Sequence, residues 1–234
     1  MTSSQSGAAL AGDAVTVAAV VLAAGRSRRF GDEDKRFALY EGRALLSHAV
    51  DAAVRSGASP VVVVVGDGDQ AAIEVVLERD RVKGGEIIAN PRADHGMGTS
   101  VACGIAAIAA RTAPGVDACF LALGDMPLVD SGLYARLLDA ASAYDFARIT
   151  VPVSGDGHRG HPVLWPRAWF PRLSVLDGER GAQALLREAE PPPVKLPVDG
   201  ANANLDIDTA DDLARLIDVR RGEMSEPRYA GPKE

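Results

Sequence analysis

Cationic and small side chains follow the first strongly apolar run of the sequence. The run ends in LAAG at residues 22–25, and Arg26, Arg28, Arg29 and Lys35 follow closely. Small side chains allow an anion to reach the backbone N–H groups, and arginine side chains match phosphate oxygens two at a time. The segment therefore predicts a polyphosphate site. The alternative is a solvated basic turn after a buried strand.

Two common nucleotide-binding motifs are absent from this segment. It lacks the GxxxxGK[ST] pattern of a Walker A loop, and Gly25 and Gly31 lack the third glycine of a dinucleotide fingerprint. An NAD-dependent oxidoreductase is therefore disfavoured, because its usual pyrophosphate-binding turn is missing.

Two aspartates farther along the chain could hold a divalent cation. Asp125 follows the apolar run FLAL, and Asp206 lies in LDID, where Leu205 and Ile207 are expected to point away from it. Mg²⁺ prefers oxygen ligands and usually binds one or two carboxylates together with substrate phosphates. We assign Asp208 to capping the next helix. The alternatives are a turn role for Asp125 and a solvated loop position for Asp206.

A glycine-flanked turn between residues 90 and 100 is a candidate for binding the sugar or the base. It carries Asn90, Gly96 and Ser100, whose N–H groups and polar side chains could contact a nucleotide. The alternative is that Thr99 or Ser100 simply caps the helix that follows.

The loop GDGHRGHP at residues 155–162 is too rich in glycine and polar groups to be part of the core. Its Arg159 and His161 could contact a second, anionic substrate. A histidine in a polar loop is more often exposed than catalytic, so we assign His161 to lining the site without an acid–base role.

These candidate residues follow apolar runs that are typical of buried strands. Helix-like segments separate the runs, which predicts a mostly parallel sheet with helices on both faces. Ligands of such sheets bind beyond the carboxyl ends of the strands, where the candidates should meet. The expected strands are 15–22, 61–65, 86–88, 118–123, 149–153, 163–165 and 194–198. The expected helices are 45–55, 69–78, 99–111, 131–143, 182–188 and 210–219, with Ser131 and either Thr209 or Asp208 as caps.

Composition indicates one α/β domain over residues 15–219, with tails at 1–14 and 220–234. The net charge of −7 disfavours general binding to nucleic acid or to an anionic membrane. The two cysteines, Cys103 and Cys119, lie in apolar segments, which predicts buried free thiols and a reducing compartment. No apolar run reaches the about 18 residues of a membrane span, so we expect a cytoplasmic protein.

The order of motifs resembles that of the MobA-like nucleotidyltransferases, and most closely that of the molybdenum cofactor cytidylyltransferases. The resemblance extends over residues 17–216. It is carried by LAAGRSRRFG with DK, NPRADHGMGTSVACGI, GDMPLVD, GHPVLW, GERGAQALL and LDIDTADDL.

This resemblance implies a Rossmann-like fold that binds a nucleoside triphosphate with Mg²⁺, or alternatively Mn²⁺. The enzyme would transfer the nucleotidyl group to a phosphomonoester and release pyrophosphate. It implies catalytic roles for Arg29, Lys35 and Asp125, and metal binding by Asp125 and Asp206. The implied nucleotide-binding residues are Leu22, Ala23, Ala24, Gly25, Arg26, Lys35, Asn90, Gly96 and Ser100, and the implied acceptor-binding residues are Arg159 and His161.

Ala24 favours CTP, because guanylyl-transferring relatives typically have glycine at this position of the motif. The acceptor would be a molybdopterin-type cofactor, with a transient contact to a molybdoenzyme or its chaperone. The chain departs from the family pattern at Phe30, where methionine is common, and by one extra residue before Lys35. The alternatives are GTP or another acceptor, such as phospholactate or a sugar phosphate, and a non-catalytic protein that binds the molybdenum cofactor.

Overall fold

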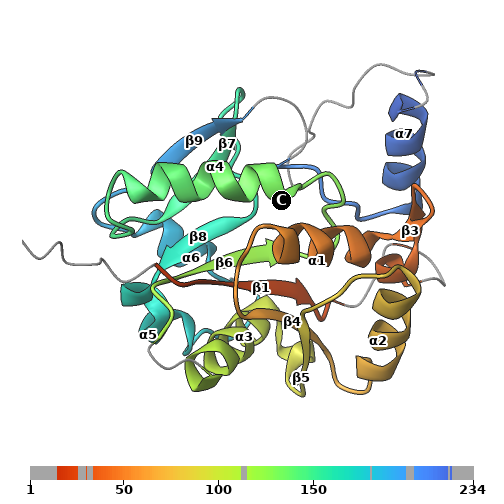
Figure 1. Ribbon diagram of the computed structural model, residues 1–234, viewed down its shortest axis with the longest axis horizontal. Coiled ribbons are helices and arrows are strands. Elements are labelled where there is room, and N and C mark those ends of the chain that lie inside the picture. Colours follow the sequence, from red (N-terminus) through yellow and green to blue (C-terminus); the bar gives the residue numbers. More distant parts are fainter. Residues whose placement is uncertain are drawn as a thin grey trace, which may run out of the picture.

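The computed structural model describes residues 15–25, 30, 34–111, 115–179, 181–198, 203–220 and 222. Within these residues, seven strands form one sheet in the order β5-β4-β1-β6-β8-β7-β9 (Figure 1). Strand β8 runs antiparallel to β6 and β7, and the other paired strands are parallel. The strands are β1 (Val17–Ala23), β4 (Val61–Gly66), β5 (Glu86–Asn90), β6 (Ala118–Leu123), β7 (Thr150–Ser154), β8 (Val163–Pro166) and β9 (Val194–Val198).

The α-helices are α1 (Leu45–Arg55), α2 (Gln70–Arg79), α3 (Met97–Arg111), α4 (Ser131–Ser142), α5 (Phe170–Leu173), α6 (Gln183–Arg187) and α7 (Ala210–Arg220). The 3₁₀ turns are η1 (Lys35–Phe37), η2 (Ala93–His95) and η3 (Arg167–Trp169), and a small hairpin joins β2 (Leu39–Tyr40) to β3 (Arg43–Ala44). No helix in the described part of the chain is long and apolar enough to cross a bilayer.

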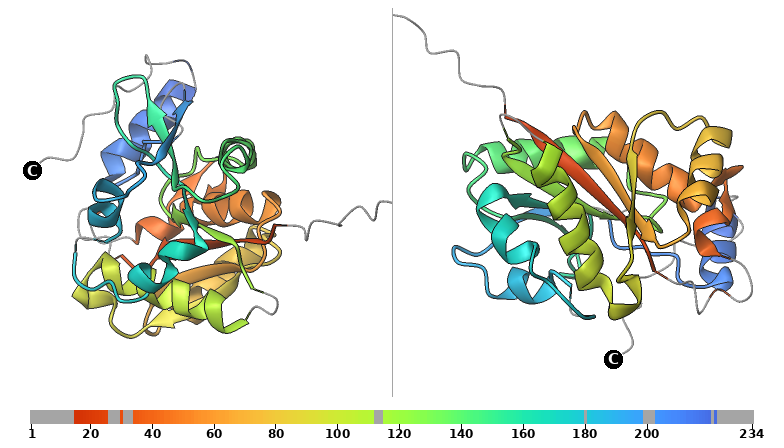
Figure 2. Two further views of the ribbon diagram at one scale, coloured as in Figure 1. Left: turned by 90° about the vertical axis from the view of Figure 1, so that its left-hand side faces the viewer. Right: turned by 90° about the horizontal axis from the view of Figure 1, so that it is seen from below.

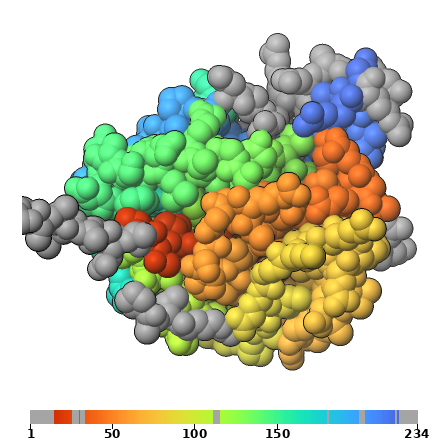
Figure 3. Space-filling view, viewed as in Figure 1, coloured from red at the N-terminus to blue at the C-terminus, as the bar shows by residue number. Residues whose placement is uncertain are grey.

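Helices cover both faces of the sheet, because the apolar strands must be buried on both sides. In β1, Ala19 and Val21 pack into the core beneath α1, α2 and α4, whereas Ala18 and Val20 pack against α3. The two views of Figure 2 show these layers, and Figure 3 shows α4 in green beside α1 in orange on the first face. The predicted fold class, a mostly parallel sheet with helices on both faces, is confirmed.

Several predicted boundaries shift by one or two residues. Strand β1 begins at Val17 rather than at residue 15, and α7 ends at Arg220, the first residue of the predicted C-terminal tail. Both cysteines are free thiols, but only Cys119 is fully buried, whereas Cys103 is half-buried. The remaining residues of both predicted tails lie outside the described residues, apart from Gly222.

Of the predicted helix caps, Ser131 is wrong, whereas for α7 the first of the two alternatives, Thr209 or Asp208, is confirmed. Helix α4 is capped by Asp130, whose carboxylate accepts the Leu133 N–H at 2.9 Å, so the predicted cap Ser131 is the first helical residue. At the start of α7, Thr209 and Asp212 form a reciprocal cap: the Thr209 N–H donates to Asp212 Oδ2 at 2.8 Å, and the Asp212 N–H donates to Thr209 Oγ1 at 3.1 Å. Asp208 is therefore not needed as a cap.

The register of β1 and β6 brings the first and fourth predicted strands together where the chain leaves the sheet. Leu22 pairs with Leu123, and the Gly124 N–H continues the ladder by donating to Leu22 O at 2.9 Å. The turn after β1 and the GDMP turn after β6 therefore emerge side by side. The strand order reverses at this point, since β4 lies on one side of β1 and β6 on the other, and such a switch point is a usual ligand site.

Candidate functional site

A cleft of about 500 Å³ opens at the carboxyl ends of β1 and β6. Its walls come from the turn after β1, from η1 and η2, from the start of α3, from the turn after β6, and from the segment before α7. The lining residues are Leu22, Ala23, Ala24, Gly25, Lys35, Arg36, Ala93, Asp94, Gly96, Met97, Ser100, Leu123, Gly124, Asp125, Glu179, Asp206 and Asp208. The cleft therefore gathers the small-residue turn, Lys35 and both aspartates predicted as metal ligands.

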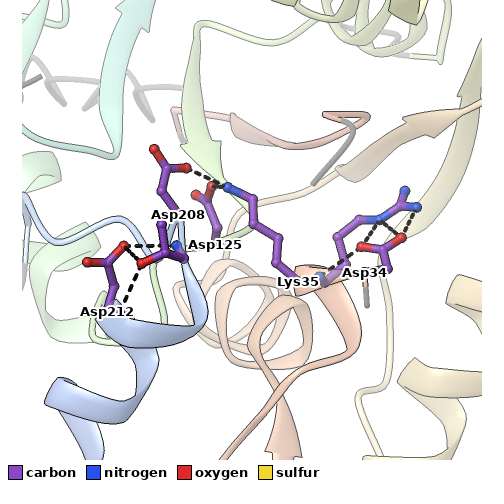
Figure 4. A network of polar contacts seen from close by, with 7 residues as sticks. Asp34, Lys35, Asp125, Asp208 and Asp212 are labelled. Carbon is purple, nitrogen blue, oxygen red and sulfur yellow. Dashed lines mark hydrogen bonds and ion pairs between the residues drawn. The ribbon is translucent and has the colours of Figure 1, made fainter. Parts of the chain in front are cut away.

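Lys35 bridges two carboxylates in this cleft. Its Nζ donates to Asp125 Oδ2 at 2.6 Å and to Asp208 Oδ1 at 2.9 Å, and Figure 4 shows both carboxylates converging on the ammonium. The side chain of Lys35 is only 14% exposed. Burial disfavours the ammonium, but Asp125 and Asp208 outweigh this effect, so the pKa of Lys35 lies above its ordinary value.

The segment before α7 is held against the GDMP turn by its backbone and by one apolar side chain. The Ile207 N–H donates to Asp125 O at 3.1 Å, and the Ile207 side chain is fully buried. Asp206 and Asp208 flank this anchor and both line the cleft. The alternation that turns Ile207 inward thus turns two carboxylates, not one, toward the site.

The site has an excess of negative charge among its described residues. Partial desolvation, together with the charges of Asp125 and Asp208, raises the pKa of Asp206. Asp125 Oδ1 is buried and has no hydrogen-bond partner in the part of the chain that the structure describes. Among the described residues, no three His, Cys, Asp or Glu side chains form a ready-made metal site. Two carboxylates that share one ion with substrate phosphates fit this arrangement, and a closed cage of protein ligands does not.

Arg36 is a cleft residue that the sequence analysis missed. Its Nη1 donates to Ala23 O at 3.0 Å and to Asp69 Oδ2 at 2.6 Å, and the guanidinium also pairs with Asp34. These contacts tie the turn after β1 to η1 and to the turn after β4. The guanidinium therefore fixes the position of the backbone at Ala23, and also that of the adjacent Lys35.

Asn90 does not line the cleft. Its Nδ2 donates to Thr99 Oγ1 at 2.9 Å and to Ser100 Oγ at 3.0 Å, and its Oδ1 accepts the Arg92 N–H at 2.9 Å. The side chain is buried, so it orients Ser100, which does reach the cleft. Thr99 and Ser100 lie in the first turn of α3, which begins two residues earlier than predicted.

Gly96 lines the cleft, but its missing side chain is explained by another segment of the chain. A Cβ at Gly96 would lie 2.5 Å from the backbone carbon of Gly178, and the Gly98 N–H donates to Gly178 O at 2.9 Å. Gly178 therefore packs on the glycine-rich turn, and the adjacent Glu179 lines the wall of the cleft.

The GHP loop holds the LDID segment in place. A Cβ at Gly160 would lie 2.0 Å from Ala203 O, and the His161 N–H donates to this same oxygen at 2.8 Å. His161 Nδ1 donates to Leu121 O at 3.3 Å, and burial lowers the pKa of the imidazole. Neither His161 nor Arg159 lines the cleft; Arg159 is exposed, and its backbone pairs with Val153.

Arg26, Arg28 and Arg29 lie outside the described residues. Their predicted contacts with phosphates stay predictions. The described residues on either side, Gly25 and Lys35, both line the cleft.

Comparison with known proteins identifies the family. A model of the MobA-like NTP transferase domain matches residues 19–193. The chain belongs to the MobA-like NTP transferase family. The predicted family is thereby confirmed, and with it the coarse functional class of a nucleotidyltransferase. The match ends before Asp206 and Asp208, so their place in the site rests on the geometry alone.

Two similar proteins, one of them with two solved structures, match most of the chain. The nicotine blue oxidoreductase of Paenarthrobacter nicotinovorans is 28% identical over an alignment of 216 residues, which covers 88% of this chain and 98% of the relative. The crystal structure of Rv0371c from Mycobacterium tuberculosis H37Rv is 30% identical, with a TM-score of 0.72, and the match covers 87% of this chain and 98% of that one. A structure of the same protein in complex with manganese is 29% identical, with a TM-score of 0.69, and covers 87% and 99% of the two chains.

Proposed function

We propose that this protein transfers CMP from CTP to the phosphate of a molybdopterin-type molybdenum cofactor and releases pyrophosphate. The observation that carries the proposal is the meeting of Lys35, Asp125 and Asp206 in one cleft beside the small-residue turn at Ala24 and Gly25. This arrangement provides cationic and backbone donors for a triphosphate, next to carboxylates for a metal ion.

A divalent cation fits the donor set of this cleft. Among the described residues, Asp125 Oδ1 is buried without a partner, and the carboxylates of Asp125, Asp206 and Asp208 outnumber the ammonium of Lys35 that bridges two of them. Asp125 and Asp206 would hold the ion, which we propose is Mg²⁺. A manganese complex of the related Rv0371c supports divalent metal binding in this branch of the family. When bound, the ion would supply charge neutralisation at the α-phosphate.

The residues of the chain contribute mainly by positioning and by neutralising charge. The second pKa of a phosphomonoester is about 6, so the attacking oxygen is already anionic at neutral pH and no general base is required. The Ala24 and Gly25 backbone can approach the phosphates closely. Lys35 would stabilise the negative charge on the transferring group and on the departing pyrophosphate, with Arg29 as the further cation implied by the family motif.

Release of pyrophosphate from each of the four nucleoside triphosphates, with Mg²⁺ and Mo-molybdopterin, tests this proposal. We expect turnover with CTP that depends on the acceptor. Asp125→Asn should lower kcat by at least about 100-fold, because it removes a charged ligand at the reacting phosphate while keeping the side-chain shape. Asp139→Asn, which changes an exposed carboxylate on α4, is the matched control.

Other results of this assay would identify the alternatives. Turnover with GTP, or with phospholactate or a sugar phosphate as acceptor, would replace the proposed nucleotide or acceptor but keep the reaction class. Tight binding of the molybdenum cofactor without pyrophosphate release would indicate a non-catalytic binding protein.

A redox reaction is the second candidate, because one relative that matches over 98% of its length is named an oxidoreductase. Oxidation of NADH or NADPH with nicotine blue as electron acceptor tests this candidate. Turnover there, together with no pyrophosphate release, would overturn nucleotidyl transfer.

A further inference from the structure

The Lys35 ammonium already contacts one oxygen of the carboxylate that we propose as a metal ligand. Lys35 Nζ donates a hydrogen bond to Asp125 Oδ2 at 2.6 Å. A cation held by the carboxylate of Asp125, through either oxygen, would lie close to this ammonium, and two like charges that share one carboxylate repel each other in a partly desolvated cleft. Metal binding at Asp125 therefore requires the ammonium to move or to be held by another group.

Among the described residues, Asp208 can hold it. Its Oδ1 lies 2.9 Å from Lys35 Nζ, and its side chain is 41% exposed, so water can solvate the part of the carboxylate that faces outward. Lys35 itself is only 14% exposed, so its ammonium needs a partner close by. Asp208 comes from the segment before α7 and Asp125 from the turn after β6, so the two partners lie on separate segments.

The backbone at Lys35 is held independently of both aspartates. Asp34 Oδ1 accepts the Arg36 N–H at 3.0 Å, and Arg36 in turn donates to Ala23 O and to Asp69. Only the end of the Lys35 side chain is therefore required to adjust when a cation arrives.

We propose that Asp208 is a positioning residue that retains the Lys35 ammonium when a divalent cation takes Asp125. The inference rests on the proposed function, because it takes the metal site from it. It gives Asp208 a role other than that of helix cap or direct metal ligand. In this role, Asp208 strengthens metal binding by drawing a competing charge away from Asp125, and it keeps that charge in the cleft for the phosphates.

Mn²⁺ binding to the nucleotide-free protein, measured by electron paramagnetic resonance of the free ion, tests this role with a double-mutant cycle. Lys35→Met should strengthen Mn²⁺ binding, because it removes the competing ammonium. Asp208→Asn should weaken binding by about tenfold in the native background, because Lys35 then loses one of its two described carboxylate partners and depends more on Asp125. In the Lys35→Met background, Asp208→Asn should weaken binding by no more than about threefold, which is the loss of one nearby charge.

Asp211→Asn is the matched control, since it removes an exposed carboxylate from the first turn of α7. It should change Mn²⁺ affinity by no more than Asp208→Asn does in the Lys35→Met background. Thermal melting of each variant verifies that it is folded.

Three results would overturn the inference. An equal loss of affinity from Asp208→Asn in both backgrounds would make Asp208 a direct ligand. No loss in either background would leave it without a role in metal binding. An absence of Mn²⁺ binding in both the native protein and Lys35→Met would remove the competition itself.

The proposed transfer is judged separately, by pyrophosphate release. If the protein transfers CMP but the effects of Lys35→Met and Asp208→Asn on Mn²⁺ affinity are additive, the proposed function stands and this inference is wrong. If the effects of the two substitutions on Mn²⁺ affinity are coupled but no CMP is transferred, the proposed function is wrong.

Discussion

One lysine and two aspartates form a network of ion pairs in this cleft. Lys35 is held at 2.6 Å by Asp125 and at 2.9 Å by Asp208, although the three residues lie far apart in the sequence. The ammonium partly neutralises carboxylates that would otherwise repel one another. Partial burial, and then the negative charges of Asp125 and Asp208, raise the pKa of Asp206. The residues that would serve a reaction with polyphosphates therefore also affect stability.

Replacing Lys35 should destabilise the metal-free protein. Lys35→Met removes the ammonium that Asp125 and Asp208 share, so the free energy of unfolding at pH 7 should fall by about 1–3 kcal/mol. Urea denaturation measures this change. Addition of Mn²⁺ should restore most of the loss, because the ion neutralises the same carboxylates. A stability equal to that of the native protein in metal-free buffer would contradict this electrostatic account.

The GHP loop and the LDID segment act as one structural unit beside the cleft. Gly160 allows the backbone of Ala203 to approach closely, and the Ile207 N–H then reaches Asp125 O at 3.1 Å. The position of the carboxylates at Asp206 and Asp208 therefore depends on a glycine in a different loop.

Gly160→Ala should displace this segment. The added methyl carbon would lie 2.0 Å from Ala203 O, so we expect both a lower melting temperature and a loss of turnover of about tenfold or more. Gly155→Ala, in the same loop, is the matched control, because a Cβ there meets no atom within 4 Å. Equal behaviour of the two variants in melting and pyrophosphate assays would refute the proposed packing role.

Helix α1 is stabilised at its N-terminus by a residue from another element. Its N-cap position is Ala44, which has no capping side chain, and the Ala44 N–H donates instead to Asp80 Oδ2 at 2.8 Å. Burial opposes ionisation of Asp80, but the hydrogen bonds from Arg79 and from the Ala44 N–H outweigh it and lower the pKa of Asp80 to about 2.

Because the folded state lowers this pKa, ionised Asp80 stabilises the fold above the ordinary value of 3.8, and the stabilisation is lost as the pH falls through about 2. Asp80→Asn should therefore lower the free energy of unfolding by about 1–2 kcal/mol at pH 7. The difference in the free energy of unfolding between Asp80→Asn and the native protein should become smaller as the pH falls from about 5 to about 3. Urea denaturation across this range measures it, with Asp139→Asn as the control; a difference that does not change with pH would exclude the charge as its cause.

Much of the architecture follows from the sequence, because each strand buried on both faces requires a continuous apolar run. The run at 61–65 and the alternation of runs with helical segments predict the parallel core directly. Parallel strands end at the same edge, so the clustering of Lys35, Asp125 and Asp206 could also be anticipated.

Contacts that depend on the close approach of distant segments could not be predicted in this way. The sequence near α7 offers two possible caps, and only the approach of Lys35 decides that Asp208 forms an ion pair while Thr209 caps the helix. Asn90 has the polar character of a ligand-binding residue, yet its three hydrogen bonds are internal. The alternation of side-chain direction on either side of Ile207 could have identified Asp208 as a cleft residue. Arg36 could have been identified because it is adjacent to Lys35.

The fate of the α-phosphate of the nucleotide tests the central claim most directly. The purified full-length protein is incubated with α-³²P-labelled CTP, Mg²⁺ and Mo-molybdopterin, and the products are separated and identified by mass spectrometry. Nucleotidyl transfer predicts that the label joins the acceptor as a CMP adduct in step with pyrophosphate release, and that Asp125→Asn abolishes both. Label that remains entirely in CTP, while the protein oxidises added NADH or NADPH with nicotine blue as electron acceptor, would contradict it.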